Sequence, residues 1–141
     1  MPQRDGFFIS TDPRRLDLDA IERLLRSSYW ASERSRASTE LAVKNSLCFG
    51  LYQTPNAGLI GLTRVVTDYS TFAWLCDVII EEEYRGKGLG KWMMEVVLAD
   101  PSVCHVRRWI LATSDAHQLY ERYGFARMAH SDRWMERVLR A

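Results

Sequence analysis

A glycine-rich loop at the start of a helix is the feature that most constrains how this 141-residue chain can fold. The stretch YRGKGLGKW, residues 84–92, places Gly86, Gly88 and Gly90 between basic side chains and then continues into apolar residues at helical spacing. Glycines let backbone N–H groups turn inward with no Cβ in the way, and a helix N-terminus adds partial positive charge. The loop therefore predicts a site for a ligand that carries phosphates.

The spacing of this loop differs from that of two common nucleotide-binding loops. A Walker loop needs a glycine where Arg85 stands and a Ser or Thr where Trp92 stands. The dinucleotide fingerprint reads GxGxxG, whereas the loop here reads GxGxG. A turn that merely starts a helix needs one or two glycines, so three glycines between cations favour a bound phosphate ligand.

Strand-like and helix-like patterns alternate around the loop. Strands are expected over residues 7–11, 47–53, 59–67, 72–81 and 109–113, with closing strands over 125–129 and 134–138. Helices are expected over residues 18–28 after a cap at Asp17, over 39–45, over 88–98, and from a cap at Ser114 or Asp115 to Tyr123. This order predicts an α/β fold with a mixed central sheet of six or seven strands flanked by about four helices, in a single domain over residues 1–141.

Two motifs in this framework resemble the signatures of a known family. Arg85-x-x-Gly88-x-Gly90 is similar to the acetyl-CoA signature [Q/R]-x-x-G-x-[G/A] of the GNAT acetyltransferases, and it lies in the same place, between the fourth strand and the third helix. Residues 116–125, AHQLYERYGF, resemble the second signature, A-x-x-L-Y-x-x-x-G-F. The stretches ISTDP and SYW are similar to one group of small stand-alone members. The resemblance covers nearly the whole chain and implies the GNAT acyl-CoA acetyltransferase fold.

The resemblance implies an acetyl-CoA-dependent N-acetyltransferase that acts by direct attack on a primary amine of a small molecule or peptide. Tyr120 matches the residue that donates a proton to the departing CoA thiolate, and the competing interpretation is that its ring only packs on the sheet. Thr113 stands where many members have asparagine, and its hydroxyl can make only part of an amide's contacts. The residues implied to hold the co-substrate are Val78, Ile79, Ile80, Arg85, Gly86, Lys87, Gly88, Leu89, Gly90, Lys91, Thr113 and Tyr120.

The amine must lose a proton before it attacks, and Asp77 is the first candidate for the base. A carboxylate within an otherwise apolar strand needs a physical reason, which is either this role or a structural hydrogen bond. Weaker candidates for proton transfer are Glu81, Glu82, Glu83, Asp68, Asp115 and His117. The three histidines do not show metal-ligand spacing, so no metal is expected.

The acceptor side is expected around residues 28–36, SYWASERSR, which combine aromatic and cationic side chains. The candidate substrate contacts are Tyr29, Trp30, Arg34 and Trp74, with Arg36 and Trp134 as further neighbours. This combination suits a substrate with a flat or apolar part and a carboxylate or phosphate. The alternative is that Tyr29 and Trp30 finish the core face of the first helix.

Charge and cysteine usage narrow the remaining functions. Nineteen Lys and Arg oppose eighteen Asp and Glu, and a net charge of +1 is a poor footprint for nucleic-acid binding. No apolar stretch approaches the roughly 18 residues of a membrane helix, and the first residues do not read as a signal peptide. With no CxxC pair among three cysteines, we expect a cytoplasmic location.

The alternative functions are a non-catalytic acyl-CoA-binding sensor and acetylation of aminoacyl-tRNA. Exposed strands near the C-terminus are compatible with a homodimer.

Overall fold

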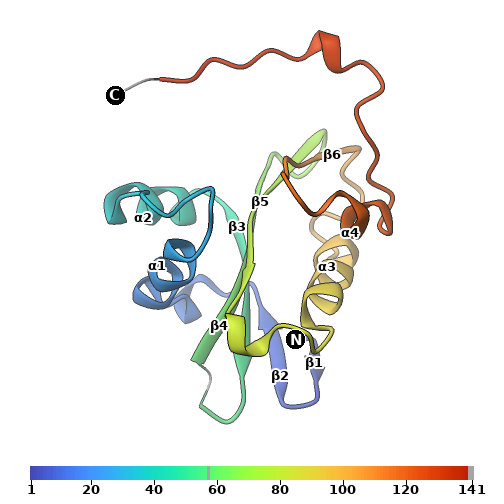
Figure 1. The fold of residues 1–141 in the computed structure, drawn as a ribbon. Coiled ribbons are helices and arrows are strands. Elements are labelled where there is room, and N and C mark those ends of the chain that lie inside the picture. The colour runs from blue at the N-terminus through green and yellow to red at the C-terminus, as the bar shows by residue number, and fades with distance from the viewer. Residues whose placement is uncertain (57, 140–141) are drawn as a thin grey trace.

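The computed structural model describes residues 1–56 and 58–139 and contains a six-stranded sheet with helices on both of its faces (Figure 1). The strands are β1 (Gln3–Arg4), β2 (Phe7–Ser10), β3 (Leu47–Gln53), β4 (Gly58–Thr67), β5 (Phe72–Ile80) and β6 (Arg108–Ile110). The helices are α1 (Leu18–Arg26), α2 (Arg36–Lys44), α3 (Leu89–Ala99) and α4 (His117–Glu121). Short 3-10 turns lie at Pro13–Arg15, Glu82–Tyr84 and Ser131–Arg133.

The strands lie in the sheet in the order of the chain, β1-β2-β3-β4-β5-β6. Neighbours pair antiparallel from β1 to β5, and β5 pairs with β6 in parallel. Parallel neighbours need a crossover, and α3 supplies it between β5 and β6. The expected mixed α/β sheet is confirmed.

Helices α1 and α2 cover one face of the sheet, and α3 covers the other together with α4 (Figure 1). Helix α1 begins where the Asp17 carboxylate accepts hydrogen bonds from the N–H groups of Asp19 and Ala20, as expected of an N-cap. Its buried residues Ile21 and Leu25 pack with β-strand residues in what we call the α1 cluster. Trp92, Met93 and Val97 of α3 pack with Leu51 and Val65 in the α3 cluster on the opposite face.

The sequence pattern did not predict β1, because both of its residues are polar and exposed. It pairs with β2 across a turn in which Asp5 and Gly6 have φ values of +49° and +85°. Asp-Gly is a known hairpin signal, so this strand could have been found from the dipeptide DG before FFIS.

The expected closing strands are wrong for the part of the chain that the structure describes. Helix α4 is followed by Gly124 at φ +89°, and the Phe125 N–H then bonds the Tyr120 carbonyl at 3.3 Å. Beyond this point the chain runs outward as a tail with a single 3-10 turn (Figure 1). Residues 125–129 and 134–138 alternate suitably in sequence, but a strand also needs backbone hydrogen bonds to a neighbouring strand, and these residues form no such pairing in the structure.

The longest helix among the described residues is α3, with eleven residues. A bilayer-spanning helix needs about 20. No described helix is therefore long and apolar enough to span a bilayer.

Candidate active site

A β-bulge in β5 decides which face of the sheet Asp77 meets. The pairing of β4 with β5 shifts register between Leu62 and Arg64, and Asp77 takes φ +24°, a value rare for residues other than glycine. Side chains separated by four residues on a regular strand share one face. Here Leu75 packs in the α3 cluster and Ile79 in the α1 cluster, so the bulge switches the strand from one face to the other.

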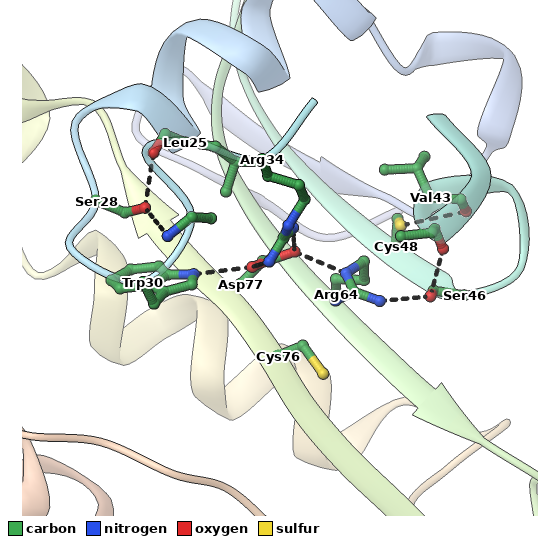
Figure 2. A network of polar contacts seen from close by, with 12 residues as sticks. Leu25, Ser28, Trp30, Arg34, Val43, Ser46, Cys48, Arg64, Cys76 and Asp77 are labelled. Atoms are coloured by element: carbon green, nitrogen blue, oxygen red, sulfur yellow. Dashed lines mark hydrogen bonds and ion pairs between the residues drawn. The ribbon is translucent and has the colours of Figure 1, made fainter. Parts of the chain in front are cut away.

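The Asp77 carboxylate is held by three side chains from two other segments (Figure 2). Arg34, in the loop between α1 and α2, donates from Nη1 to Oδ2 at 2.7 Å and from Nη2 to Oδ1 at 3.2 Å. Arg64 of β4 donates from Nε to Oδ2 at 2.7 Å, and its Nη1 bonds the Ser46 hydroxyl at 3.1 Å. Trp30 donates from Nε1 to Oδ1 at 2.8 Å. The side chain of Asp77 is 2% exposed, so this arrangement is a buried polar network.

The surroundings of Asp77 are unfavourable for a general base. Burial raises the pKa of this carboxyl, but the hydrogen bonds from Arg34, Arg64 and Trp30 outweigh burial and lower the pKa below its usual value. A base needs affinity for a proton and an accessible lone pair, whereas both oxygens of Asp77 already accept hydrogen bonds from cations or an indole. The geometry thus favours the structural hydrogen bond over the base.

Hydrogen bonds of Ser28 connect the loop that carries Trp30 and Arg34 to the end of α1. The Ser28 hydroxyl donates to the Leu25 carbonyl at 2.7 Å and accepts the Ala31 N–H at 3.1 Å (Figure 2). These bonds tie the loop to the end of α1. Trp30 and Arg34 therefore lie over the sheet in fixed positions, and Trp30 does not simply finish the buried face of α1.

The glycine loop leads from β5 into the N-terminus of α3. Gly86 and Gly88 have φ values of +80° and +77°, and Gly88 is the N-cap residue. A Cβ built on either glycine would meet no protein atom within 4 Å, so the space in front of the loop is open. No side chain of the described residues caps α3, which leaves its first N–H groups for a ligand.

Side chains around this loop fix its shape and add positive charge. Arg85 donates from Nε to the Ile80 carbonyl at 2.9 Å. The Lys87 ammonium lies 5.6 Å from the centre of the Tyr84 ring, in a cation–π position. Arg85, Lys87 and Lys91 are exposed, whereas the Leu89 side chain is buried in the α3 cluster and can offer a ligand only its backbone.

Strands β5 and β6 separate soon after they pair. Their register runs from Phe72 opposite Arg108 to Trp74 opposite Ile110 and ends there, although a strand was expected as far as Thr113. The early end has a physical reason, because the bulge at Asp77 changes the course of β5. A cavity of about 560 Å³ lies where the strands diverge, and its lining includes Trp30, Arg34, Trp74, Asp77, Val78 and Tyr120.

Tyr120 borders this cavity from α4. Its ring is also packed, in an edge-to-face contact with Phe125 at 5.9 Å between centroids, so the two interpretations of this residue are compatible. Burial raises the pKa of Tyr120, with smaller contributions from Tyr29 and Asp115. Its phenol is therefore protonated at neutral pH.

The N-cap residue of α4 is Ala116 rather than the expected Ser114 or Asp115, and no side chain of the described residues makes a cap hydrogen bond there. In the segment before the helix, the Thr113 Oγ1 accepts the Ala116 N–H at 3.1 Å. The Ser114 N–H instead bonds the Tyr29 hydroxyl at 3.0 Å, which brings Tyr29 across the cavity mouth to this segment. Hydrogen bonds from Ser114 lower the pKa of Tyr29.

A family model described as the acetyltransferase (GNAT) domain matches residues 44–127, a range that includes the bulge, the glycine loop, the diverging strands and Tyr120. The chain belongs to the GNAT acetyltransferase family. This GNAT chain is 33% identical over 136 residues to a protein of Gibberella zeae that bears an acetyltransferase name, a match over 83% of this chain and 77% of that protein.

Solved GNAT structures share the fold. A crystal structure of a GNAT-family protein from Xanthomonas campestris pv. campestris is 40% identical, with a TM-score of 0.88 over 99% of this chain and 95% of that chain. A GNAT acetyltransferase from Elizabethkingia anophelis, crystallised with acetyl-CoA bound, is 15% identical, with a TM-score of 0.64 over 97% of this GNAT chain and 90% of its own. The second likeness shows the fold alone.

Two of the expected acceptor residues of this GNAT chain, Arg36 and Trp134, do not line the cavity beside Tyr120. Arg36 pairs with Asp19 at 2.6 Å and Glu22 at 2.8 Å, on the outer side of α1. Trp134 lies in the tail, 5.4 Å from the Arg108 guanidinium, and borders a different cavity. The cavity beside Tyr120 contains Tyr29, Trp30, Arg34 and Trp74, which are the other four.

Sequence reasoning missed Arg64. A signal for it was present, because arginine inside the apolar strand LIGLTRVVT needs an anionic partner. Asp77, on the strand expected to pair with this one, was the obvious candidate. Only the register of the two strands shows that their side chains meet.

The weaker candidates for proton transfer have other neighbours. Asp68 accepts hydrogen bonds from Ser70 and Thr71 in the β4–β5 turn, and these bonds hold the pKa of its carboxyl well below the usual range. Glu82 and Glu83 are exposed in a 3-10 turn. Asp115 lines the cavity, so it stays a candidate.

The three cysteines, Cys48, Cys76 and Cys104, are free thiols in the structure. Burial raises the pKa of the Cys48 thiol to about 12. Cys76 lines the cavity, and burial raises its pKa as well, so little thiolate is present there at neutral pH. Within residues 1–56 and 58–139, no three His, Cys, Asp or Glu side chains gather as metal ligands.

Proposed function

We propose that this GNAT chain is an acetyl-CoA-dependent N-acetyltransferase that moves an acetyl group to a primary amine of a small molecule or peptide by direct attack. One observation carries the proposal: β5 leads directly into an open, glycine-lined helix N-terminus and borders the cavity that Tyr120 lines. A phosphate-bearing thioester that follows β5 would therefore have its reactive end in the cavity.

The loop would hold the CoA pyrophosphate through backbone N–H groups of residues 86–91 and through Arg85, Lys87 and Lys91. Open space in front of Gly86 and Gly88 supports this placement, as does the absence of a side-chain cap on α3 among the described residues. The shared fold of the Elizabethkingia anophelis protein, which binds acetyl-CoA, is consistent with it.

The pantetheine arm would lie along β5 beyond Trp74, where pairing with β6 has ended. Val78 borders the cavity, and Ile79 and Ile80 follow it toward the loop. Their backbone groups would bond the arm, and an N–H in this stretch would stabilise the negative charge that develops on the thioester oxygen.

Tyr120 would protonate the departing thiolate. The thiol of CoA is expected near the ordinary thiol pKa of about 8.5, so modest help is sufficient. A buried phenol with a raised pKa is protonated at neutral pH and can supply that help as a donor. Asp77 takes a different role in this proposal, as a positioning residue that holds Trp30 and Arg34 at the cavity.

The test is to measure thiol release from acetyl-CoA with a panel of amino acids, polyamines, arylamines and peptide N-termini, beside calorimetric binding of acetyl-CoA. We expect binding and amine-dependent thiol release. Binding with no release by any amine would indicate the sensor module instead. Salt-sensitive tRNA binding with acetylation of aminoacyl-tRNA would indicate the other alternative.

Two further expectations accompany this function. The free thiols of Cys48, Cys76 and Cys104 fit a cytoplasmic enzyme. A homodimer stays a prediction. Met135 and Leu139 in the tail are exposed apolar residues, so variants at these two positions, with the molar mass in solution measured by light scattering, would test it.

A further inference from the structure

The wall of the cavity formed by the α1–α2 loop, β4 and β5 has more positive than negative charge. Arg34 and Arg64 share the single carboxylate of Asp77 through two salt bridges of 2.7 Å. The Arg34 side chain is 23% exposed, against 12% for Arg64 and 2% for Asp77. Arginine has five N–H donors, and the two bonds from Arg34 to Asp77 leave three of them for other acceptors. Arg34 is therefore the cation that a ligand in this cavity can reach.

A second part of the cavity lining carries a negative charge. Asp115 lines the cavity from the segment that starts α4, beside Tyr120. It is exposed, and its carboxylate lies 3.5 Å from the Thr113 hydroxyl. The cavity is thus polarised, with a cation on the Asp77 side and a carboxylate on the Tyr120 side.

Aromatic rings line the same cavity. Trp30 is 42% exposed and Trp74 is 45% exposed, although large aromatic side chains normally bury most of their surface. The Trp30 indole is fixed by its hydrogen bond to Asp77, and Tyr29 contacts it edge-to-face at 5.1 Å between centroids. A ring that is held in place and yet open to a cavity, as Trp30 is, is suited to contact a flat or apolar ligand group at low entropic cost, and Trp74 adds a second exposed ring.

We infer that the acceptor is a small amino acid-like molecule with an aromatic or flat apolar group, whose carboxylate binds Arg34 and whose amine lies toward Asp115 and Tyr120. This inference rests on the proposed function. A bidentate-capable guanidinium suits a planar carboxylate, and the opposed charges suit a zwitterion. A polyamine would instead place a second cation near Arg34, which is unfavourable.

The reaction balances without a further co-reactant. The neutral amine attacks the thioester carbonyl carbon, so a C–N bond forms and the C–S bond breaks. The thiolate takes a proton from Tyr120, and the proton lost by the amine passes to Asp115 or water before solvent restores the phenol. The products are the N-acetyl amino acid-like molecule and CoA.

The test compares acceptors that differ in one group, by initial rates of thiol release. L-Phenylalanine is compared with 2-phenylethylamine, which lacks the carboxylate, with L-phenylalanine methyl ester, which masks it, and with L-alanine, which lacks the ring. The first two controls have amine pKa values on either side of that of phenylalanine, so amine basicity alone cannot favour phenylalanine over both. We expect kcat/KM for L-phenylalanine to exceed each control by at least about tenfold. Equal or faster acetylation of 2-phenylethylamine or spermidine would overturn the inference.

Variants assign the preference to residues. Arg34→Gln removes the accessible cation, and we expect the preference of phenylalanine over 2-phenylethylamine to fall about tenfold or more. Trp74→Ala should reduce the preference of phenylalanine over alanine while thermal stability and acetyl-CoA affinity stay near wild type. Tyr69→Asn is the matched control, because Tyr69 is an exposed aromatic residue in the β4–β5 turn with φ +64°, which asparagine tolerates. A Trp74→Ala variant that keeps its preference would refute the role of this ring.

Ligand binding separates this inference from the proposed function. If no amine supports thiol release, the proposed function fails, and calorimetry with N-acetyl-L-phenylalanine and N-acetyl-2-phenylethylamine in the presence of CoA still reports on the cavity. Stronger binding of the carboxylate-bearing ligand, lost in Arg34→Gln, would support the ligand class. Equal or no binding of the two ligands would overturn it.

Discussion

The indole Nε1 of Trp30 lies 2.8 Å from Oδ1 of Asp77, so a carboxylate of the central sheet holds an aromatic side chain of the cavity wall by a hydrogen bond. The same carboxylate holds Arg34 and Arg64. A loop between two helices is thereby positioned against β5 by side chains rather than by backbone pairing. Because one residue orients both an aromatic and a cationic part of the cavity, its replacement should affect both the stability of the fold and the proposed binding of an acceptor.

Replacing Tyr120 by phenylalanine should separate chemistry from co-substrate binding. The variant keeps the ring and its contact with Phe125 but loses the hydroxyl that would protonate the thiolate. We expect kcat to fall by at least about tenfold and the Kd for acetyl-CoA to change by less than about twofold. Rapid-quench measurements under conditions where chemistry is limiting, together with calorimetry, provide the check. Wild-type turnover in this variant would remove the acid role.

A Gly90→Glu substitution should stabilise the protein and weaken acetyl-CoA binding at the same time. Gly90 lies in the first turn of α3, and a Cβ there is 3.7 Å from Ile80 Cδ1, an ordinary contact. Loss of glycine and addition of a carboxylate near a helix N-terminus each favour the helix, by about 1 kcal/mol together. The same carboxylate repels a phosphate at the loop, so we expect acetyl-CoA affinity to fall more than tenfold.

Urea unfolding and calorimetry measure the two effects, with Gly90→Ala as the uncharged control. This control should gain similar stability and lose less affinity, because it adds no negative charge. Unchanged acetyl-CoA affinity in Gly90→Glu would contradict the placement of the phosphates.

Replacing Asp77 by asparagine should destabilise the fold. Asparagine has nearly the same shape but carries no charge, so Arg34 and Arg64 lose the anion that neutralises them. Breaking a buried ion pair by removing one partner typically costs 3–5 kcal/mol, and the partial exposure of Arg34 reduces this to about 2–4 kcal/mol. Urea denaturation at neutral pH measures the change. A loss below about 1 kcal/mol would show that the network contributes little to stability.

The stability that Asp77 contributes should depend on pH in a defined direction. Its pKa in the folded protein is lowered, and the ordinary value of an unfolded aspartate is about 3.9. A lowered folded-state pKa means that the contribution is complete above this unfolded value and is lost as pH falls through the folded-state value. The difference in unfolding free energy between wild type and Asp77→Asn should therefore stay constant from pH 7 to about pH 5 and shrink as the pH is lowered further toward 3.

A carboxylate in a surface ion pair gives the matched control for this pH series. Asp12 pairs at 3.1 Å with Arg14, whose side chain is 89% exposed, and hydrogen bonds from Arg14 lower the pKa of Asp12 as well. Because solvent screens such a pair, Asp12→Asn should show a much smaller stability loss and a much smaller pH dependence than Asp77→Asn. A difference between wild type and Asp77→Asn that stays constant from pH 7 to pH 3 would contradict the assigned pKa shift.

Local patterns predicted most of the elements around the site. The residues 47–53 were expected as a strand and form β3 with those bounds, and Asp17 caps α1 as expected. The glycine loop was found because the φ values and open space that it needs are properties of a few consecutive residues. Such features depend on local backbone preference and periodicity, which the sequence carries directly.

The network around Asp77 could not be predicted to the same extent. It joins residues 43 positions apart and 13 positions apart along the chain, and it exists only because the bulge turns Asp77 toward the α1–α2 loop. Bulges leave little trace in composition. The predicted strands in the tail were wrong for a related reason. The alternating residues at 134–138 satisfy the strand pattern, yet strand pairing depends on which backbone lies nearby.

The bulge in β5 constrains the number of residues between Leu75 and Ile79 more than their types. Deleting one residue between Leu75 and Ile79 would remove the bulge and let β5 pair regularly with β4, with Leu75 and Ile79 still opposite Val65 and Leu62. Asp77 would lose its φ of +24°, and its carboxylate would lose its present geometry toward Trp30 and Arg34. A substitution keeps the chain length that the bulge needs, whereas a single-codon deletion would remove the bulge and disturb the wall of the cavity that Trp30 and Arg34 form.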